Sequence, residues 1–332
     1  MILVTGATGL VGGHLLWHLL QENITVNAIK RPTSNLEPLR QIFNFYTPHA
    51  DAFLRRIQWR IADVCDEKSI TEALSGIETV YHCAAVVSLG NGGNELIATN
   101  LNGTKNVVNA ALKNKIKRFC FVSSIAACGH SLDDELITET TEIGNIEMRS
   151  AYSRSKYYSE QEVWKGIKAG LNAVIVNPGV ILGFSGKNKG SSELFARVRK
   201  GLPFYTYGGS GYIDVQDVAK LMIKLTNGTV TAERFILVAE NCSNKDVLSW
   251  MADGYGKRRP TIGINKKFLL AIGYFSEMVG KILPITPVLD RSLARSASNR
   301  AFYSNNKIIE ITNFQFNSIE KCIIEVCKFD KK

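Results

Sequence analysis

The chain has 332 residues, of which 45% are hydrophobic and 21% are charged. This length and composition are typical of an ordinary soluble protein with one large or two smaller domains, and they argue against disorder and low complexity. The formal net charge of +10 comes from basic residues spread along the chain, and no nucleic-acid-binding motif accompanies them. We therefore expect a solvated surface and anionic small ligands, and no nucleic-acid partner.

Three features bear on location and on metal binding. The apolar run 2–4 directly follows Met1 and leaves no room for a signal peptide, so we expect the cytoplasm. The seven cysteines show no C-x-x-C spacing, which indicates neither a disulfide framework nor a metal site. The apolar segment 268–285 carries charged residues and a proline and is shorter than the ~20 residues of a membrane span. It predicts a buried or amphipathic helix, with peripheral membrane contact as an open alternative.

In the first half of the chain, apolar β-branched runs alternate with helix-length segments. Strands are predicted at 2–5, 24–29, 57–61, 79–82, 118–123 and 173–177, and helices at 10–20, 68–74, 96–112 and 152–169. Each crossover between parallel strands must return across a face of the sheet. The pattern therefore predicts an α/β fold with a doubly wound parallel Rossmann sheet.

After Pro178 the pattern is looser. Glycine-rich segments at 183–190 and 201–211 flank a predicted helix at 192–200, and a helix at 215–225 and a strand at 235–238 follow; the rest is predicted to be mostly helical, ending in a helix at 318–327. We expect residues 1–178 to form a dinucleotide-binding domain, to which 212–240 return. Residues 179–211 and 241–332 would form a smaller, mostly helical substrate-binding region. It would close a cleft at the carboxyl edge of the sheet, where ligands bind in such folds.

A glycine-rich turn, T-G-A-T-G-L-V-G-G at 5–13, follows the first strand and opens the first helix. Gly6 permits the tight turn, Gly9 lets the backbone approach a pyrophosphate, and Gly12 lets the helix pack closely. The helix N-terminus adds free amide groups and the positive end of its dipole. We expect this turn to bind a dinucleotide through Thr5, Gly6, Thr8, Gly9, Leu10, Val11 and Gly12.

The residues after the second and third strands indicate which dinucleotide is bound. An acidic residue after the second strand would bind the ribose 2′-hydroxyl of NAD, but this chain has Lys30 and Arg31 there. These cations can pair with a 2′-phosphate, which favours NADP; if both are plain surface residues, NAD is the alternative. Asp63, followed by Val64, is placed to accept a hydrogen bond from the adenine amino group, although a simple turn aspartate would look the same.

Tyr152 and Lys156 lie four residues apart on a predicted helix, so they project from the same face. A nearby ammonium group stabilises phenolate and lowers a tyrosine pKa from ~10 towards the working range of a proton donor and acceptor. Such pairs also occur by chance. This one opens the helix between the strands ending at Ser123 and Asn177, after a glycine-rich cofactor turn, and it predicts an oxidoreductase.

Together these motifs resemble the extended short-chain dehydrogenases/reductases of the NAD-dependent epimerase/dehydratase superfamily over residues 1 to about 240. The resemblance rests on the T-G-x-x-G-x-x-G turn, Asp63, H-C-A-A at 82–85, T-N-L-N-G-T at 99–104, Ser123-Ser124, Tyr152-x-x-x-Lys156, Pro178-Gly179 and V-Q-D-V-A at 215–219.

The resemblance implies a role for each matching position. Tyr152 would be the general acid/base, Lys156 would lower its pKa and bind the nicotinamide ribose, and Ser124 would hydrogen-bond the substrate oxygen. Asn100 would support the lysine and a proton-relay water. The backbone at Ala84, Ala85, Pro178, Gly179 and Val180 would line the cofactor. A homodimer through the helices at 96–112 and 152–169 is expected by the same analogy.

The residues around these motifs bear on which reaction is catalysed. Ser124 is followed by Ile125, Ala126 and Ala127, without the acidic pair of nucleotide-sugar dehydratases. The segment S-G-Y-I-D-V at 210–215 lacks the arginine that nucleotide-sugar epimerases carry in an Arg-Asp-Phe-like segment there. The apolar edge and Arg31 resemble the dihydroflavonol reductase and 3β-hydroxysteroid dehydrogenase branch. We expect reduction of a ketone or aldehyde, or the reverse oxidation. A nucleotide-sugar epimerase with tightly bound NAD and a non-catalytic dinucleotide-binding regulator remain alternatives.

Overall fold

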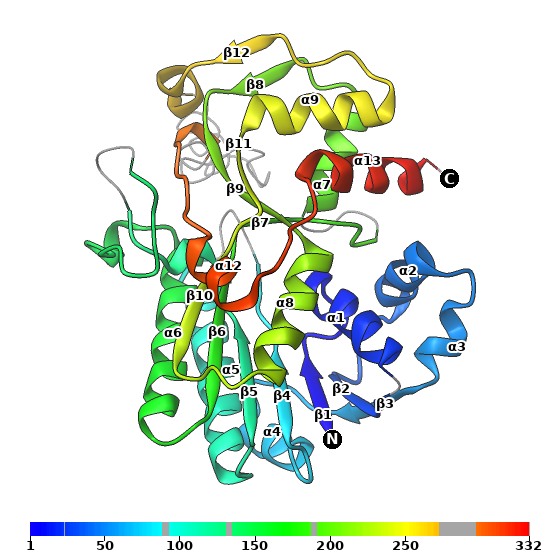
Figure 1. Cartoon of the computed structure of the whole chain (residues 1–332), viewed down its shortest axis with the longest axis vertical. Coiled ribbons are helices and arrows are strands. Elements are labelled where there is room, and N and C mark those ends of the chain that lie inside the picture. The colour runs from blue at the N-terminus through cyan, green and yellow to red at the C-terminus, as the bar shows by residue number, and fades with distance from the viewer. Residues whose placement is uncertain (23, 88–92, 131–134, 187–190, 272–296, 332) are drawn as a thin grey trace, which may run out of the picture.

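A computed structural model describes the chain except residues 23, 88–92, 131–134, 187–190, 272–296 and 332. Its central feature is a seven-stranded parallel sheet of strand order β10-β6-β5-β4-β1-β2-β3 (Figure 1). The strands are β1 (Ile2–Thr5), β2 (Val26–Lys30), β3 (Ile57–Ile61), β4 (Thr79–His82), β5 (Arg118–Val122), β6 (Ala173–Pro178) and β10 (Glu233–Leu237). The strand order reverses direction between β1 and β4, which confirms the predicted doubly wound Rossmann sheet.

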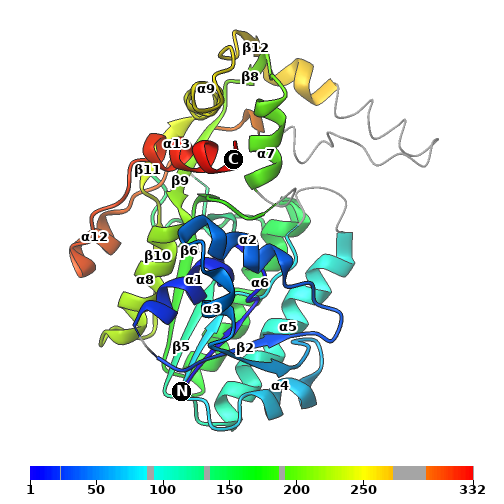
Figure 2. The same cartoon turned by 90° about the vertical axis from the view of Figure 1, so that its right-hand side faces the viewer.

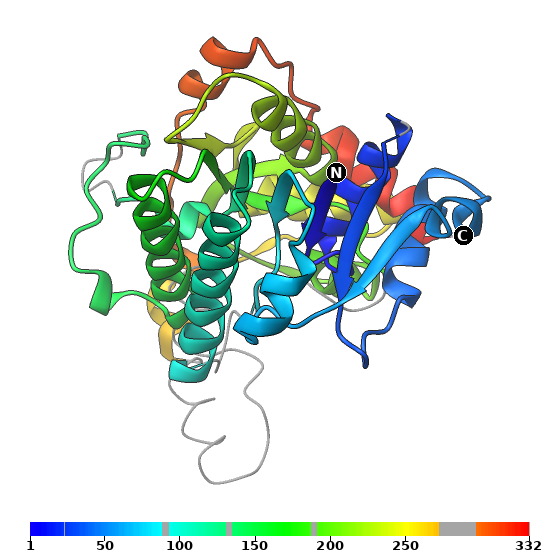
Figure 3. The same cartoon turned by 90° about the horizontal axis from the view of Figure 1, so that it is seen from below.

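Helices cover both faces of this sheet because successive side chains of each strand point to opposite faces. Val4 belongs to the apolar cluster beneath α1 (Leu10–Gln21) and α8 (Val215–Asn227), whereas Leu3 belongs to the cluster on the other face. That second face is covered by α4 (Glu67–Ala73), α5 (Gly93–Lys113) and α6 (Ala151–Lys168). Figure 3 shows α5 and α6 packed side by side there.

Two helices between β2 and β3 were not predicted. They are α2 (Glu37–Tyr46) and α3 (Ala50–Leu54), and α2 packs against α1. Leu39, Ile42 and Phe43 form the buried face of α2. The Trp17 ring of α1 stacks on Tyr46 with 4.6 Å between ring centroids, so α2 and α3 shield the outer side of α1.

The chain beyond the large sheet combines helices with two small sheets, and the sequence predicted only the helical part. One small sheet joins β7 (Val180–Leu182), β9 (Gly209–Asp214) and β11 (Glu240–Ser243), and the other joins β8 (Phe204–Thr206) and β12 (Ile262–Ile264). The helices are α7 (Ser191–Arg199), α9 (Asn244–Tyr255), α12 (Asn306–Thr312) and α13 (Ile319–Asp330). Figure 2 shows α7, α9 and α13 stacked beyond one end of the sheet.

This second part is linked to the sheet through β9 and α8. Asp214 at the end of β9 caps α8 by accepting a hydrogen bond from the Gln216 backbone (2.9 Å). The strand β10 then joins the sheet beside β6. The division into residues 1–178 with 212–240 and the remaining two segments stays a prediction.

Two sequence features fall largely or partly outside the described residues. Most of the predicted helix at 268–285 and the second half of the glycine-rich segment 183–190 lie there. Within the described residues, no helix has the length and apolar character needed to cross a membrane.

Candidate cofactor and active site

The glycine-rich turn between β1 and α1 is shaped by contacts that only glycine allows. Gly6 has φ of +66°, and a Cβ on it would lie 2.6 Å from the backbone nitrogen of Ala84. A Cβ on Gly12 would lie 2.2 Å from the Gly6 carbonyl oxygen, so the first turn of α1 packs directly on the loop. Gly9 is exposed and caps α1 without a side chain. No side chain therefore caps the amides at the start of this helix, which is where helices bind anions.

Thr5 is fully buried and links the ends of β1 and β4. Its Oγ1 accepts a hydrogen bond from the Ala84 backbone nitrogen (3.1 Å) and lies 2.8 Å from Nδ1 of His82. The other ring nitrogen of His82 lies 3.2 Å from Oγ1 of Thr104. Burial lowers the pKa of His82 to about 3, and Lys156 adds to this, so the imidazole is neutral at physiological pH. Thr5 thus fixes the turn against β4 from inside the core.

The polar residues after β2 and β3 lie at neighbouring strand ends. The Nζ of Lys30 lies 5.5 Å from the Trp59 ring centroid, whereas Arg31 is exposed and its backbone nitrogen donates to Oγ of Ser34 (3.0 Å). Oδ1 of Asp63 accepts a hydrogen bond from the Cys65 backbone nitrogen (2.9 Å). This is the geometry of a simple turn aspartate, the alternative to a residue that binds adenine. Arg31 is thus the more exposed of the two cations.

At the carboxyl end of β5 the structure brings Ser124, Tyr152 and Lys156 together. Ser150 caps α6 by accepting from the Ser153 backbone nitrogen (3.2 Å), so Tyr152 stands in the first turn of this helix. The Tyr152 hydroxyl lies close enough to the Ser124 side chain for the serine to lower the pKa of the phenol. Lys156 is 4% exposed, and its Nζ donates to the Val122 carbonyl oxygen (3.0 Å).

Burial shifts the pKa values of Lys156 and Tyr152 and so determines their protonation. It lowers the pKa of Lys156 to about 8, while the nearby Cys83 and Glu160 oppose the shift. It raises the pKa of Tyr152, against the opposing effect of the Ser124 hydrogen bond. The phenol is therefore protonated at neutral pH and can donate a proton, and Lys156 follows it one helical turn further along α6.

Asn100 is buried on α5, and its side-chain amide forms hydrogen bonds to the backbone of Val86 and to the side chain of Ser155. Its Oδ1 accepts from the Val86 backbone nitrogen (2.7 Å), and its Nδ2 donates to the Val86 carbonyl (2.9 Å) and to Oγ of Ser155 (3.1 Å). It therefore contacts the residue before Lys156 and holds the segment after β4 against α5 and α6.

The predicted cofactor-lining residues end the strands on either side of β5. Ala84 and Ala85 follow β4; Pro178 ends β6, and Val180 begins β7. The Gly179 nitrogen donates to the Leu237 carbonyl (2.9 Å), and a Cβ there would lie 2.4 Å from the Gly211 carbonyl oxygen. Because β6, β5, β4 and β1 are consecutive in the sheet, these residues and the glycine-rich turn follow one edge.

Glu160 lies outside the motifs found in the sequence, and the structure buries it behind Ser123 and Asn177. It accepts hydrogen bonds from Ser123 and Asn177 and pairs with Arg234. The available signal was its spacing: Tyr152, Lys156 and Glu160 recur every four residues on one helix face.

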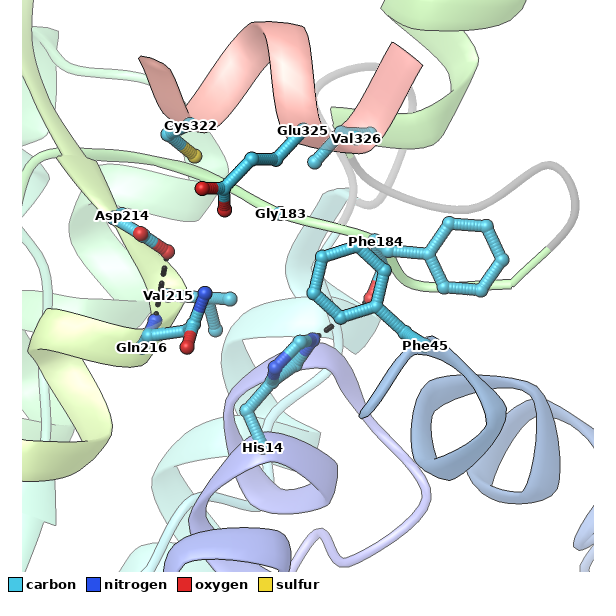
Figure 4. Close-up of a pocket in the computed structure, with 10 residues that line it drawn as sticks. All are labelled: His14, Phe45, Gly183, Phe184, Asp214, Val215, Gln216, Cys322, Glu325 and Val326. Atoms are coloured by element: carbon cyan, nitrogen blue, oxygen red, sulfur yellow. Dashed lines mark hydrogen bonds between the residues drawn. The ribbon is translucent and has the colours of Figure 1, made fainter. Parts of the chain in front are cut away.

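Figure 4 shows a separate pocket between α1, α2, the segment after β7, the start of α8 and α13. Its lining residues are His14, Phe45, Gly183, Phe184, Asp214, Val215, Gln216, Cys322, Glu325 and Val326. Nε2 of His14 lies 2.8 Å from the Phe184 carbonyl oxygen, and burial lowers the pKa of this histidine to about 4. None of the predicted site residues lines this pocket, and its internal hydrogen bonds indicate a packing contact of α13.

The fold is that of a Rossmann-type protein whose carboxyl edge carries a glycine-rich turn and a tyrosine-lysine pair. The chain belongs to the NAD dependent epimerase/dehydratase family, whose model matches residues 2–235. The resemblance found in the sequence is thereby confirmed, and the chain is an oxidoreductase of the extended short-chain dehydrogenase/reductase type.

Relatives with different activities share this fold. The chain is 28% identical over 329 residues to a putative dihydroflavonol 4-reductase of Synechocystis sp., covering 97% of this chain and 92% of the relative. It is 28% identical over 280 residues to sterol demethylase protein B of Methylococcus capsulatus, covering 83% and 80%. The solved structure of gox2253 is 25% identical with a TM-score of 0.84, covering 100% of this chain and 98% of that one. A Thermus thermophilus UDP-glucose 4-epimerase solved with NAD, 19% identical with a TM-score of 0.75 and covering 99% and 98%, shares the fold.

Proposed function

We propose that the protein is an NADP-dependent reductase of a ketone or aldehyde, which also catalyses the reverse alcohol oxidation. The observation that carries this proposal is the placement of Ser124 close to Tyr152, with the buried Lys156 one turn further along α6. It supplies a proton donor, a second hydroxyl and a cation at one place, next to the glycine-rich turn. Relatives named dihydroflavonol 4-reductase and cinnamoyl-CoA reductase support a reductase.

Each side chain has a step to perform. When bound, the reduced dinucleotide supplies the hydride that the carbonyl carbon accepts. Tyr152 donates its phenolic proton to the carbonyl oxygen as negative charge develops there. Ser124 donates a hydrogen bond to the same oxygen, which stabilises the developing charge. Lys156 stabilises the phenolate that remains on Tyr152.

The glycine-rich turn fits the dinucleotide, because no Cβ blocks the loop at Gly6 or Gly12 and the exposed Gly9 leaves the helix amides accessible. Arg31 would pair with the 2′-phosphate of NADP, and Asp63 and Val64 would lie at the adenine. Asn100 would act by holding the segment at Val86 and the helix at Ser155. The regions 179–211 and 241–332 would hold the substrate.

The apolar character of the edge favours a substrate with a largely apolar framework. Val86 and Val87 after β4 are 47% and 62% exposed, and Val180 after β6 is 40% exposed. These valines follow β4 and β6, the strands on either side of β5, which leads to Ser124. Apolar side chains that stay exposed beside convergent polar groups are typical of small-molecule sites.

A screen of NADPH consumption would test the proposal with aldehydes, ketones and steroid- or flavonoid-like carbonyl compounds, and with UDP- and dTDP-sugars alongside. We expect oxidation of NADPH by an apolar carbonyl compound, and Tyr152→Phe should lower kcat by about 10²–10⁴-fold because the proton donor is lost. Tyr157→Phe is the matched control, since that ring packs edge-on against Tyr158 on the same helix.

Three results would contradict the proposal. Tightly bound NAD in the purified protein together with sugar epimerisation would indicate the epimerase. A chain that binds the dinucleotide but reduces none of the carbonyl compounds would favour the regulator. Turnover that Tyr152→Phe leaves intact would remove the tyrosine from the mechanism.

A further inference from the structure

Glu160 is a buried carboxylate one helical turn beyond Lys156, with 1% of its surface exposed. Its Oε2 accepts from Oγ of Ser123 (2.7 Å) and from Nδ2 of Asn177 (2.8 Å). Its Oε1 accepts from Arg234 (3.1 Å) and from Nε1 of Trp164 (3.3 Å). A buried charge is costly unless it is paired and hydrogen-bonded. The chain meets both conditions, with donors from β5, β6, β10 and α6.

Two of these donors adjoin Ser124. Ser123 immediately precedes it, and Nδ2 of Asn177 donates both to Glu160 and to the Ser124 carbonyl oxygen (3.0 Å). The carboxylate therefore joins the ends of β5 and β6 on both sides of Ser124, the serine that lies close to Tyr152. Nothing in the proposed proton transfer needs Glu160 to touch the substrate.

Arg234 completes the arrangement from the edge strand β10. Its side chain is 16% exposed, and its Nε donates to the Glu139 carbonyl oxygen (2.9 Å). The Glu139 carboxylate in turn accepts from the Ile236 backbone nitrogen (2.8 Å). The arginine is thus held on two sides, and its position relative to Glu160 does not depend on a ligand.

We propose that Glu160, paired with Arg234, is a positioning residue that holds the Ser124 backbone beside Tyr152 and supplies the negative charge that balances the Lys156 ammonium. This inference rests on the proposed function of Ser124, Tyr152 and Lys156.

The charges around Lys156 give the direction of the expected effect. Cys83 and His82 face it from β4 and Glu160 from its own helix, with Arg234 behind Glu160. The pKa of His82 is about 3, so this ring is neutral, and burial raises the pKa of Cys83, so this thiol is neutral as well. Cys128 also lies near Glu160, and burial raises its pKa to about 12. Replacing Glu160 by glutamine removes the negative charge and leaves Arg234 uncompensated, and both changes lower the pKa of Lys156.

The experiment measures binding of NADPH by its fluorescence, and kcat for the carbonyl compound, from about pH 6 to about pH 9.5. In Glu160→Gln we expect the alkaline limb of both profiles to move down by about one pH unit, because Lys156 loses its proton earlier. Ser123→Ala keeps the charge and removes one hydrogen bond, so we expect a several-fold fall in kcat with the alkaline limb unmoved. Glu162→Gln is the matched control on the same helix, since that carboxylate pairs with the exposed Lys165 and should behave as wild type.

Unchanged alkaline limbs in a Glu160→Gln protein that melts as wild type would overturn the inference and leave the proposed function standing. If Glu160→Gln does not fold, Ser123→Ala decides, and a kcat equal to that of wild type would overturn the inference. A wild-type chain that binds neither NADPH nor NADH would overturn the proposed function and this inference with it.

Discussion

At the scale of single residues, charge and burial separate residues that look alike in the sequence. Lys30 and Arg31 are adjacent cations, yet one lies against the Trp59 ring and the other is exposed beside Ser34. Tyr152 and Lys156 could be paired from their spacing alone, because one helix carries both. Glu160 could not be assigned in this way, since its pairing with Arg234 joins residues 74 positions apart. Local patterns predict which side chains share a face, whereas the burial of a charge depends on distant partners.

The positions of Lys30 and Arg31 lead to a prediction about the choice between NADPH and NADH. Arg31→Leu should raise the KM for NADPH roughly tenfold, because a charge-assisted pair with the 2′-phosphate is lost. The KM for NADH should change little, since NADH has no such phosphate. Lys30→Met is the matched variant, and we expect a smaller effect because its ammonium lies over the Trp59 ring. Initial rates with both dinucleotides measure this, and an equal loss for NADH and NADPH in Arg31→Leu would contradict it.

At the scale of elements, the sequence predicted the strands of the large sheet well and the small sheets not at all. Central parallel strands are buried on both faces and form continuous apolar runs, as in β6, where Val174 and Ile175 are both fully buried. Strand β9 instead begins with Gly209, Ser210 and Gly211 and resembles a loop. Its glycine allows close packing, because a Cβ on Gly211 would lie 2.6 Å from a Val238 methyl group.

The helix α2 differs from β9, because its sequence does carry the apolar spacing of its own element, but over only ten residues. Leu39, Ile42 and Phe43 have the spacing of one helix face, but α2 spans only Glu37–Tyr46 and has a proline near its start. Its stability comes from packing on α1, as is usual for helices of this length. Tertiary contacts therefore determine the secondary structure of α2 and β9, which the local sequence leaves ambiguous.

The contact between α8 and the segment before α13 leads to a prediction about how the free energy of unfolding depends on pH. The Asn317 backbone nitrogen donates to Oδ2 of Asp217 (2.7 Å), and burial raises the pKa of Asp217 to about 6. Because the folded state holds this proton more tightly than the unfolded state, the group favours folding below about pH 4, and that contribution is lost as the pH rises through about 6. Asp217→Asn keeps an acceptor without the charge, so it should raise the free energy of unfolding at pH 7 by about 1–2 kcal/mol and change it little near pH 4.

Urea unfolding at both pH values measures this difference. Asp51→Asn is the control, since Asp51 is a surface partner of Arg40 with 56% of its side chain exposed. A stabilisation by Asp217→Asn of equal size at pH 4 and pH 7 would contradict the assignment to this carboxyl group.

At the scale of the whole molecule, the predicted ligand site follows the edge along which the sheet meets the rest of the chain. Gly179 illustrates the meeting point, because its nitrogen bonds to Leu237 of the large sheet while its Cα packs against the Gly211 carbonyl of a small one. A dinucleotide bound along this edge would bind the folded state alone, so it should stabilise the molecule as a unit.

This coupling can be measured by thermal unfolding. At about 100 times its Kd, NADPH should add about 2.7 kcal/mol, which corresponds to a rise in Tm of roughly 4 °C for a chain of this size. Gly12→Ala should remove the rise, because its methyl group would lie within 2.2 Å of the Gly6 carbonyl oxygen and force the turn apart. Gly228→Ala is the control, since a Cβ there would meet its nearest neighbour, the Lys224 carbonyl oxygen, at 3.3 Å, far from the turn in sequence. If Gly12→Ala kept the full rise in Tm, the dinucleotide would have to bind elsewhere, and the glycine-rich turn would be a connection between β1 and α1 alone.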